Sequence, residues 1–294
     1  MTVNNTQLSH FISGMPTPKA EYSKLKLTAI FLASIPLFVA WTLLSLIAWP
    51  FLKVASCLGA KCAWANSLVN ECFSLWVAAA HYCFASKFSA GNGQPILLVH
   101  GYLHNGSDWY TILDELKKEG LGPVYTIDLG DGTLDGKFWS IRDYAEQVGK
   151  KVAEIQEETG WDEIALVGHS MGGIVSSLYA TKLADYGTVT DVIAIGSPFK
   201  GSPLADCFAI GSCGEEMRPD SSLLEEVRQG IKQAPEIEFY SIASETDEVV
   251  PLSSALYNED PQKQLIVEDE GHVALLTSAK VAKTVASWLK TKNL

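Results

Sequence analysis

From about residue 94 onward, short apolar runs rich in β-formers alternate with stretches of helical pattern. The apolar runs predict strands at Ile96–His100, Val124–Leu129, Ile164–Val167, Val192–Ile195, Ile237–Ala243 and Gln264–Val267. The stretches between and after them predict helices at Trp109–Lys118, Ile141–Thr159, Met171–Tyr186, Ser222–Gln233 and Val273–Lys290. Continuous apolar runs suit strands buried on both faces, and alternation with helices predicts right-handed crossovers. We therefore expect a doubly wound α/β domain with a mostly parallel sheet.

A long apolar segment at residues 27–52 precedes this domain and contains no charged side chain. As a helix of 1.5 Å per residue it would span about 39 Å, more than the roughly 30 Å of a hydrocarbon core. We expect a single transmembrane anchor there, preceded by a basic tail at residues 1–26. The alternatives are a cleaved signal peptide, whose apolar core is usually shorter, and lipoprotein processing at Cys57.

The connecting region, residues 53–90, is apolar but interrupted by Asn66, Asn70, Glu71 and His81. These polar groups are costly at the centre of a bilayer, so an amphipathic, interfacial region is expected rather than a second span. With one span and the basic tail inside, the domain at residues 91–294 would lie outside the cytoplasm. A second span would return it to the cytoplasm.

The distribution of charge also changes at the boundary between residues 1–90 and residues 91–294. Residues 1–90 carry six Lys against two Glu, whereas residues 91–294 carry 16 basic against 32 acidic residues. An acidic domain repels a phosphate backbone, so nucleic-acid binding is excluded and a neutral or small substrate is expected.

The six cysteines have no spacing typical of a zinc site, and no histidine lies near them in a ligand arrangement. Four of them fall in the apolar N-terminal region and are expected to be small buried hydrophobes. Cys207 and Cys213 lie close together in a predicted loop. A disulfide between them is possible if the domain lies outside the cytosol.

One motif carries chemistry. Gly168-His169-Ser170-Met171-Gly172 follows a predicted strand and precedes a predicted helix, which is the context that G-x-S-x-G requires. A sharp turn strains the serine, so the positions two residues away on each side must lack bulk, and Gly168 and Gly172 fulfil this. The following helix directs its N-terminal dipole at a developing oxyanion. With Gly173, this GHSMGG segment resembles the α/β-hydrolase superfamily, specifically bacterial lipases and esterases, over roughly residues 94–290.

The resemblance implies a catalytic acid and then a histidine, both C-terminal to the nucleophile. His272 is the only histidine after Ser170, and it follows the last predicted strand. Asp247 lies in a loop after the penultimate strand that resembles the acid loop of the family, with Glu245 and Glu248 as neighbouring rivals. The implied triad is therefore Ser170, Asp247 and His272.

The family also implies an oxyanion hole of two backbone N–H groups. One belongs to Met171, and the other to Tyr102, because His100-Gly101-Tyr102 resembles the HG-x motif of the family. We expect no metal and no cofactor at this site, and we expect His100 and His104 to order the loop rather than to bind metal.

Two further stretches resemble lipase motifs: residues 196–205 (GSPFKGSPLA) and residues 217–224 (MRPDSSLL). Residues 199–236 leave room for a small cap but not for a large lid domain. The resemblance implies a serine carboxylic ester hydrolase acting through an acyl-enzyme, and the apolar anchor favours acyl glycerols or related lipid esters. The alternatives are an acyltransferase or phospholipase with the same triad, and a non-enzymatic, membrane-tethered binding protein. The sequence does not identify a protein partner.

Overall fold

Seven strands form one sheet in the part of the chain that the structure describes. The computed structural model describes residues 71, 88–89, 91–102, 104, 106–129, 139–208, 211–257 and 260–290, all within one compact unit, Ser56–Leu294. The strands are β1 (Phe88–Ser89), β2 (Ile96–Val99), β3 (Val124–Ile127), β4 (Ile164–His169), β5 (Val189–Ile195), β6 (Glu238–Ser244) and β7 (Gln264–Val267). Their order is β1-β3-β2-β4-β5-β6-β7, and only β1 pairs antiparallel to its neighbour. The expected parallel α/β sheet is confirmed.

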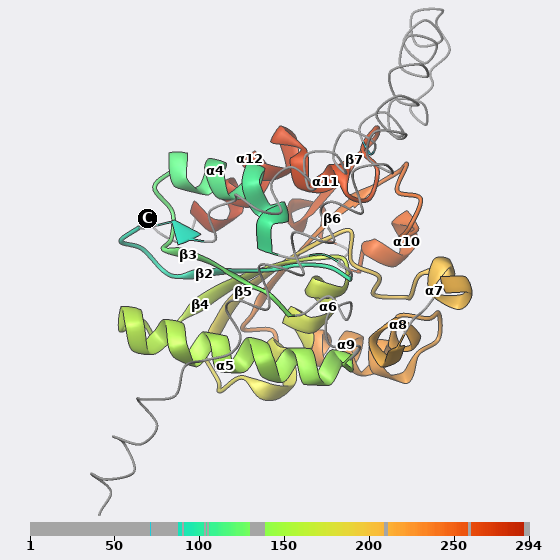
Figure 1. Cartoon of the computed structure of the whole chain (residues 1–294), viewed down its shortest axis with the longest axis horizontal. Helices are drawn as coiled ribbons and strands as arrows, with labels where there is room; N and C mark the ends of the chain where they lie inside the picture. Colours follow the sequence, from blue (N-terminus) through green and yellow to red (C-terminus); the bar gives the residue numbers. More distant parts are fainter. Residues whose placement is uncertain are drawn as a thin grey trace, which may run out of the picture. The chain divides into compact units, whose positions relative to one another are not determined.

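Helices cover both faces of this sheet (Figure 1). On one face lie α4 (Tyr110–Lys118), α11 (Ala274–Thr277) and α12 (Ala279–Lys290), and on the other lie α5 (Ile141–Thr159), α6 (Met171–Leu178) and α9 (Ser222–Gln233). Shorter elements are the 3-10 helices η1 (Gly106–Trp109) and η3 (Pro261–Lys263), the π-helical turn η2 (Tyr179–Leu183), and helices α7 (Pro203–Phe208), α8 (Gly211–Glu216) and α10 (Leu252–Ala255). The result is the three-layer architecture expected of a doubly wound domain.

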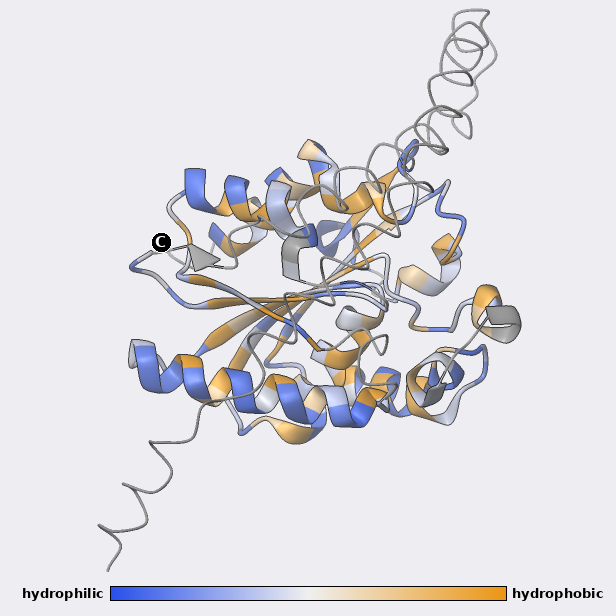
Figure 2. Cartoon of the chain, viewed as in Figure 1, coloured by the Kyte–Doolittle hydropathy of each residue, from blue (hydrophilic) through white to orange (hydrophobic). Residues whose placement is uncertain are grey.

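The core lies on both sides of the sheet because alternate side chains of each strand point to opposite faces. In β2, Leu97 and Val99 join the cluster beneath α5 and α6, whereas Ile96 and Leu98 join the cluster beneath α4 and α12. All four are buried. Figure 2 shows the strands as hydrophobic and α5 as amphipathic, with its hydrophilic side turned away from the sheet.

The predicted bounds of α5 are correct because local signals fix both ends. Ser140 accepts a hydrogen bond from the amide of Asp143, whose carboxylate accepts one from the amide of Ser140. At the other end Gly160 adopts φ 73°, a left-handed conformation that ends a helix. This capping box and this glycine cap are visible in the sequence.

Two stretches that were each predicted as one helix are divided in the structure. The stretch predicted as one helix, Val273–Lys290, is divided at Ser278, whose extended backbone separates α11 from α12. The Ser278 hydroxyl accepts from the amide of Val281, so this residue begins a new helix. The helix predicted over Met171–Tyr186 is α-helical only to Leu178 and then continues as η2.

The structure does not describe residues 1–70, so the expected basic tail and the transmembrane segment at 27–52 lie outside the described residues. Among the residues that were described, no helix is long and apolar enough to cross a bilayer. The connecting region, residues 53–90, is described only at Glu71 and at β1, which adds an antiparallel edge strand that the sequence pattern did not predict.

Cys213 is a free thiol, fully buried among the side chains beneath α5. Cys213 therefore takes no part in the disulfide that the sequence left open. Burial raises the pKa of the Cys213 thiol to about 11, which makes it a structural apolar group rather than a reactive one.

Candidate active site

Ser170 lies in a strained turn between β4 and α6. Its backbone has φ 53° and ψ −124°, a conformation that residues with a side chain rarely adopt. The turn also leaves no room for side chains at its flanking glycines. A Cβ on Gly168 would lie 2.4 Å from the main chain of Gly172, and a Cβ on Gly172 would lie 2.1 Å from the carbonyl oxygen of Val99. The two glycines are therefore required by the packing of this turn.

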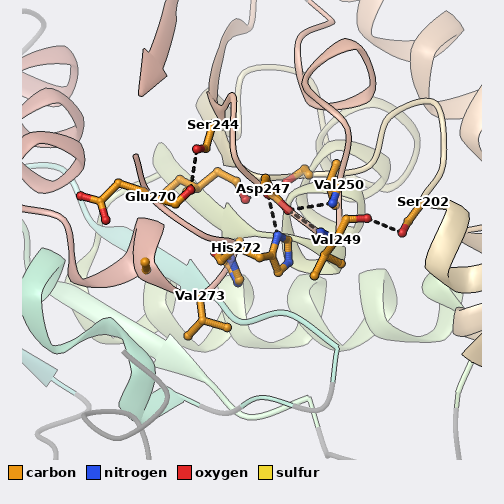
Figure 3. Close-up of polar contacts among 12 residues, drawn as sticks. Ser202, Ser244, Asp247, Val249, Val250, Glu270, His272 and Val273 are labelled. Carbon is orange, nitrogen blue, oxygen red and sulfur yellow. Dashed lines mark hydrogen bonds and ion pairs between the residues drawn. The ribbon is translucent and has the colours of Figure 1, made fainter. Parts of the chain in front are cut away.

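Asp247 and His272 form a buried hydrogen-bonded pair. His272 Nδ1 donates to Asp247 Oδ2 at 2.8 Å, and the two side chains are 7% and 1% exposed. The other carboxylate oxygen, Oδ1, accepts from the amides of Val249 at 2.8 Å and Val250 at 2.7 Å (Figure 3). Three hydrogen bonds thus hold the carboxylate in position, whereas the neighbouring rivals Glu245 and Glu248 are exposed.

The loops that carry these two residues are tied to each other. The main-chain carbonyl of Glu270, in the loop after β7, accepts a hydrogen bond from the Ser244 hydroxyl at 2.5 Å (Figure 3). It also accepts one from the Thr246 hydroxyl at 3.1 Å. Ser244 ends β6 and Thr246 begins the loop that leads to Asp247. Asp247 and His272 therefore lie on two loops that hydrogen bonds hold together.

The charge around His272 favours its protonated form. Burial lowers the pKa of this imidazole, but the charge of Asp247 and its hydrogen bond raise it, and the carboxylates of Glu71 and Glu248 add to the rise. The net result is a pKa above the ordinary value of 6.5. An imidazole in this setting is stabilised when it takes up a proton, as a general base must do.

The serine turn and the imidazole lie at the same edge of the sheet, where β4 to β7 end. The His169 ring lies 4.7 Å from the His272 ring, and the Ser170 amide donates to the Ile195 carbonyl at 2.8 Å. A Cβ on Gly196, the next residue, would lie 3.4 Å from both Asp247 Oδ2 and His272 Cε1. Among the described residues no hydrogen bond joins the Ser170 hydroxyl to His272, and bonds of this kind commonly tighten only when substrate binds.

The loop after β2 lies directly against the serine. A Cβ on Gly101 would lie 3.0 Å from Ser170 Cβ, so this glycine brings the backbone of Tyr102 close to the turn that also holds the amide of Met171. His100 orders the loop: its Nδ1 donates to the Gly101 carbonyl at 2.8 Å, and its Nε2 accepts from the amide of residue 129 at 2.9 Å.

His104 is paired with a carboxylate in the same region. Its Nδ1 lies 2.6 Å from Oδ2 of Asp108, four residues further along the chain. This contact fits the expected loop-ordering role. Residues that could hold a metal ion do not gather anywhere in the described segments.

The two stretches that resemble lipase motifs pack against each other. Gly201 has φ +88°, and a Cβ there would lie 2.4 Å from the nitrogen of Pro219. The amide of Ser202 donates to the Met217 carbonyl at 2.9 Å, and its hydroxyl donates to the Val249 carbonyl at 2.6 Å (Figure 3). Both stretches thereby support the loop of Asp247.

Sequence reasoning missed two residues beside this site. His169 was interpreted only as the variable position of the motif, yet its fully buried ring contacts His272. Glu71 was interpreted only as a polar interruption of an apolar region, yet its carboxylate binds the backbone after His272. A lone carboxylate in an otherwise apolar stretch was the signal available for Glu71.

Residues 96–236 match the model of the Alpha/beta hydrolase family, a span that runs from β2 through the Ser170 turn to the end of the α9 region. The chain belongs to the α/β-hydrolase superfamily. This α/β hydrolase is also similar in structure to a lipase of Bacillus licheniformis, BlEst2 in its mature form. The TM-score is 0.56 at 19% identity, and the alignment covers 70% of this chain and 94% of that one. That likeness concerns the fold.

Curated relatives of this α/β hydrolase include a triacylglycerol lipase of Burkholderia plantarii, 32% identical over 141 residues, which are 45% of this chain and 37% of the relative. A pimeloyl-[acyl-carrier protein] methyl ester esterase of Aliivibrio salmonicida is 28% identical over 107 residues, or 36% and 37% of the two chains. The matched region spans little more than a third of the length of these relatives.

Proposed function

We propose that this α/β hydrolase is a serine carboxylic ester hydrolase with Ser170 as nucleophile, His272 as general base and Asp247 as the acid that orients it. The observation that carries the proposal is the 2.8 Å hydrogen bond from His272 Nδ1 to Asp247 Oδ2 at the sheet edge that also holds the strained Ser170 turn. That bond leaves Nε2 of the imidazole unprotonated and able to take up a proton.

The reaction would proceed by acyl transfer in two steps. His272 Nε2 accepts the Ser170 hydroxyl proton while Oγ attacks the ester carbonyl, and the amides of Tyr102 and Met171 stabilise the tetrahedral oxyanion. His272 then gives its proton to the leaving alkoxide, and the alcohol departs. Water attacks the acyl-enzyme by the same path, which releases the carboxylic acid and restores the Ser170 hydroxyl.

Acyl glycerols or related lipid esters are the proposed substrates. The relatives named as triacylglycerol lipases support this class, and so does the apolar segment at 27–52, which as a membrane anchor would hold the site near lipid. The same anchor would leave the hydrolase domain outside the cytoplasm. Protease accessibility of residues 91–294 in intact cells would test that placement, because cleavage only after lysis would contradict it.

The test of activity uses the full chain and p-nitrophenyl esters of increasing chain length, together with emulsified triacylglycerol. Ser170→Ala is expected to lower kcat/KM by about 10⁴-fold or more, because the nucleophile is removed and only binding and the oxyanion donors remain. A fluorophosphonate probe should label wild type and not the variant. Unchanged hydrolysis by a folded, pure Ser170→Ala protein would overturn the proposal.

A further inference from the structure

A glutamate from the connecting region lies beside the proposed catalytic histidine. The Glu71 residue is 9% exposed, and its carboxylate accepts hydrogen bonds from the amides of Val273 and Ala274, each at 2.9 Å. These amides belong to the two residues that directly follow His272. Glu71 is about 200 positions earlier in the chain, so the contact joins two distant parts of the sequence.

The same carboxylate also meets the residue before the histidine. A Cβ on Gly271 would lie 2.4 Å from Glu71 Oε2, so only glycine allows this approach. The backbone on both sides of His272 is thus held against one side chain. A loop fixed in this way keeps the imidazole in one orientation, which a general base requires.

Glu71 also contributes charge to the site. The groups that face it or its neighbours are Glu248 and Asp247 from the loop after β6 and His272 from the loop after β7. Burial raises the pKa of Glu71 to about 7, the hydrogen bonds from Val273 and Ala274 oppose this rise, and the charge of Glu248 adds to it. When ionised, Glu71 in turn raises the pKa of His272.

We propose that Glu71 is a positioning residue for His272, which holds the histidine loop through two backbone amides and adds a negative charge beside the imidazole. This inference rests on the proposed function, because it assigns Glu71 to the general base of that mechanism. It also makes the connecting region part of the working site, so that the hydrolase domain depends on residues before β1.

Two substitutions separate the two contributions. Glu71→Gln keeps an oxygen that can accept from the amides and removes the charge, whereas Glu71→Ala removes both. The matched control is Glu157→Gln, the same change at an exposed position of α5, on the opposite face of the sheet. The readout is the pH profile of kcat/KM and of kcat for ester hydrolysis by the full chain.

We expect Glu71→Gln to shift the acidic limb of the kcat/KM profile to lower pH, since loss of a nearby negative charge lowers the pKa of His272. Its plateau kcat should stay within about threefold of wild type. Glu71→Ala should lower plateau kcat by about a hundredfold, because the histidine loop loses its anchor. Glu157→Gln should change neither quantity.

An unmoved acidic limb in Glu71→Gln, or a wild-type plateau in Glu71→Ala, would overturn the inference. Should Glu71→Ala fail to fold, the shift of the limb in Glu71→Gln still decides. The proposed function has its own readout: if Ser170→Ala hydrolyses esters like wild type, that function fails. If activity depends on Ser170 while both Glu71 variants behave as wild type, only the inference about Glu71 fails.

Discussion

His169 Nε2 donates a hydrogen bond to the main-chain carbonyl of His272 at 3.0 Å. The bond connects the residue before the proposed nucleophile to the proposed base across 103 positions of the chain. The His169 ring is fully buried, and its other nitrogen, Nδ1, has no hydrogen-bond partner among the described residues. This hydrogen bond therefore joins the serine turn directly to the histidine loop.

His169→Phe is expected to change how stability depends on pH. Burial holds the pKa of His169 well below 6.5, and the nearby His272 and His104 lower it further. The unfolded chain therefore binds a proton that the native state rejects, so wild type loses stability as the pH falls below about 6.5. At pH 8 the free energy of unfolding of the variant should be about 1–3 kcal/mol below that of wild type, because the His272 carbonyl loses its donor. From pH 7 to pH 5 the free energy of unfolding should fall less in the variant than in wild type.

Urea unfolding of both proteins at pH 8, 7, 6 and 5 checks this prediction. Equal pH dependence in wild type and His169→Phe would contradict it.

Asp247→Asn should lower kcat by about 10³–10⁴-fold with little change in fold. The asparagine oxygen can still accept from the amides of Val249 and Val250, so its amide nitrogen would face His272 Nδ1. The imidazole would then carry its proton on Nε2 and could not act as base. Steady-state kinetics test this, with Glu245→Gln, an exposed neighbour in the same loop, as the control. An Asp247→Asn enzyme within tenfold of wild type would exclude Asp247 as the orienting acid.

Gly172→Ala should destabilise the protein by about 3 kcal/mol or more, because the added Cβ would overlap the main-chain oxygen of Val99 and neither backbone can yield easily. Gly120→Ala is the control, since it has a positive φ of 70° but nothing within 4 Å of the new Cβ. That change should cost only about 1–2 kcal/mol. Chemical denaturation measures both, and similar losses in the two variants would argue against a steric requirement at Gly172.

Cys213 should resist alkylation in the native protein. With a pKa of about 11, only about one thousandth of this thiol is ionised at pH 8, and the side chain is fully buried. Iodoacetamide at pH 8 should modify it only after unfolding, as followed by peptide mass mapping. Recovery of Cys213 in a disulfide-linked peptide with Cys207 from unreduced protein would be incompatible with the structure.

Much of the fold could be predicted from sequence because the signals are local. The six parallel strands are short apolar runs, and α5 carries a capping box at Ser140 and a left-handed glycine at Gly160. The positions of Ser170, Asp247 and His272 after β4, β6 and β7 follow from the rule that parallel sheets place their sites at the carboxyl ends of strands. The structure places all three residues at that edge.

The features that sequence could not supply depend on contacts between distant residues. β1 has two residues and no pattern of its own, and it exists as a strand only by pairing with β3. Glu71 gains its role from a loop about 200 positions later. The division between α11 and α12 had a local signal in Ser278, but the apolar periodicity on both sides of that serine predicted one continuous helix.

The bridge from Ser244 and Thr246 to the Glu270 carbonyl has a consequence for engineering. The bridge needs two hydroxyl side chains on the Asp247 segment but only a main-chain carbonyl on the His272 segment. A grafted Asp247 segment without these hydroxyls would therefore lose the hydrogen bonds that couple it to the recipient's histidine loop. Chimeras that exchange residues 244–250 should therefore keep a hydroxyl side chain at positions 244 and 246.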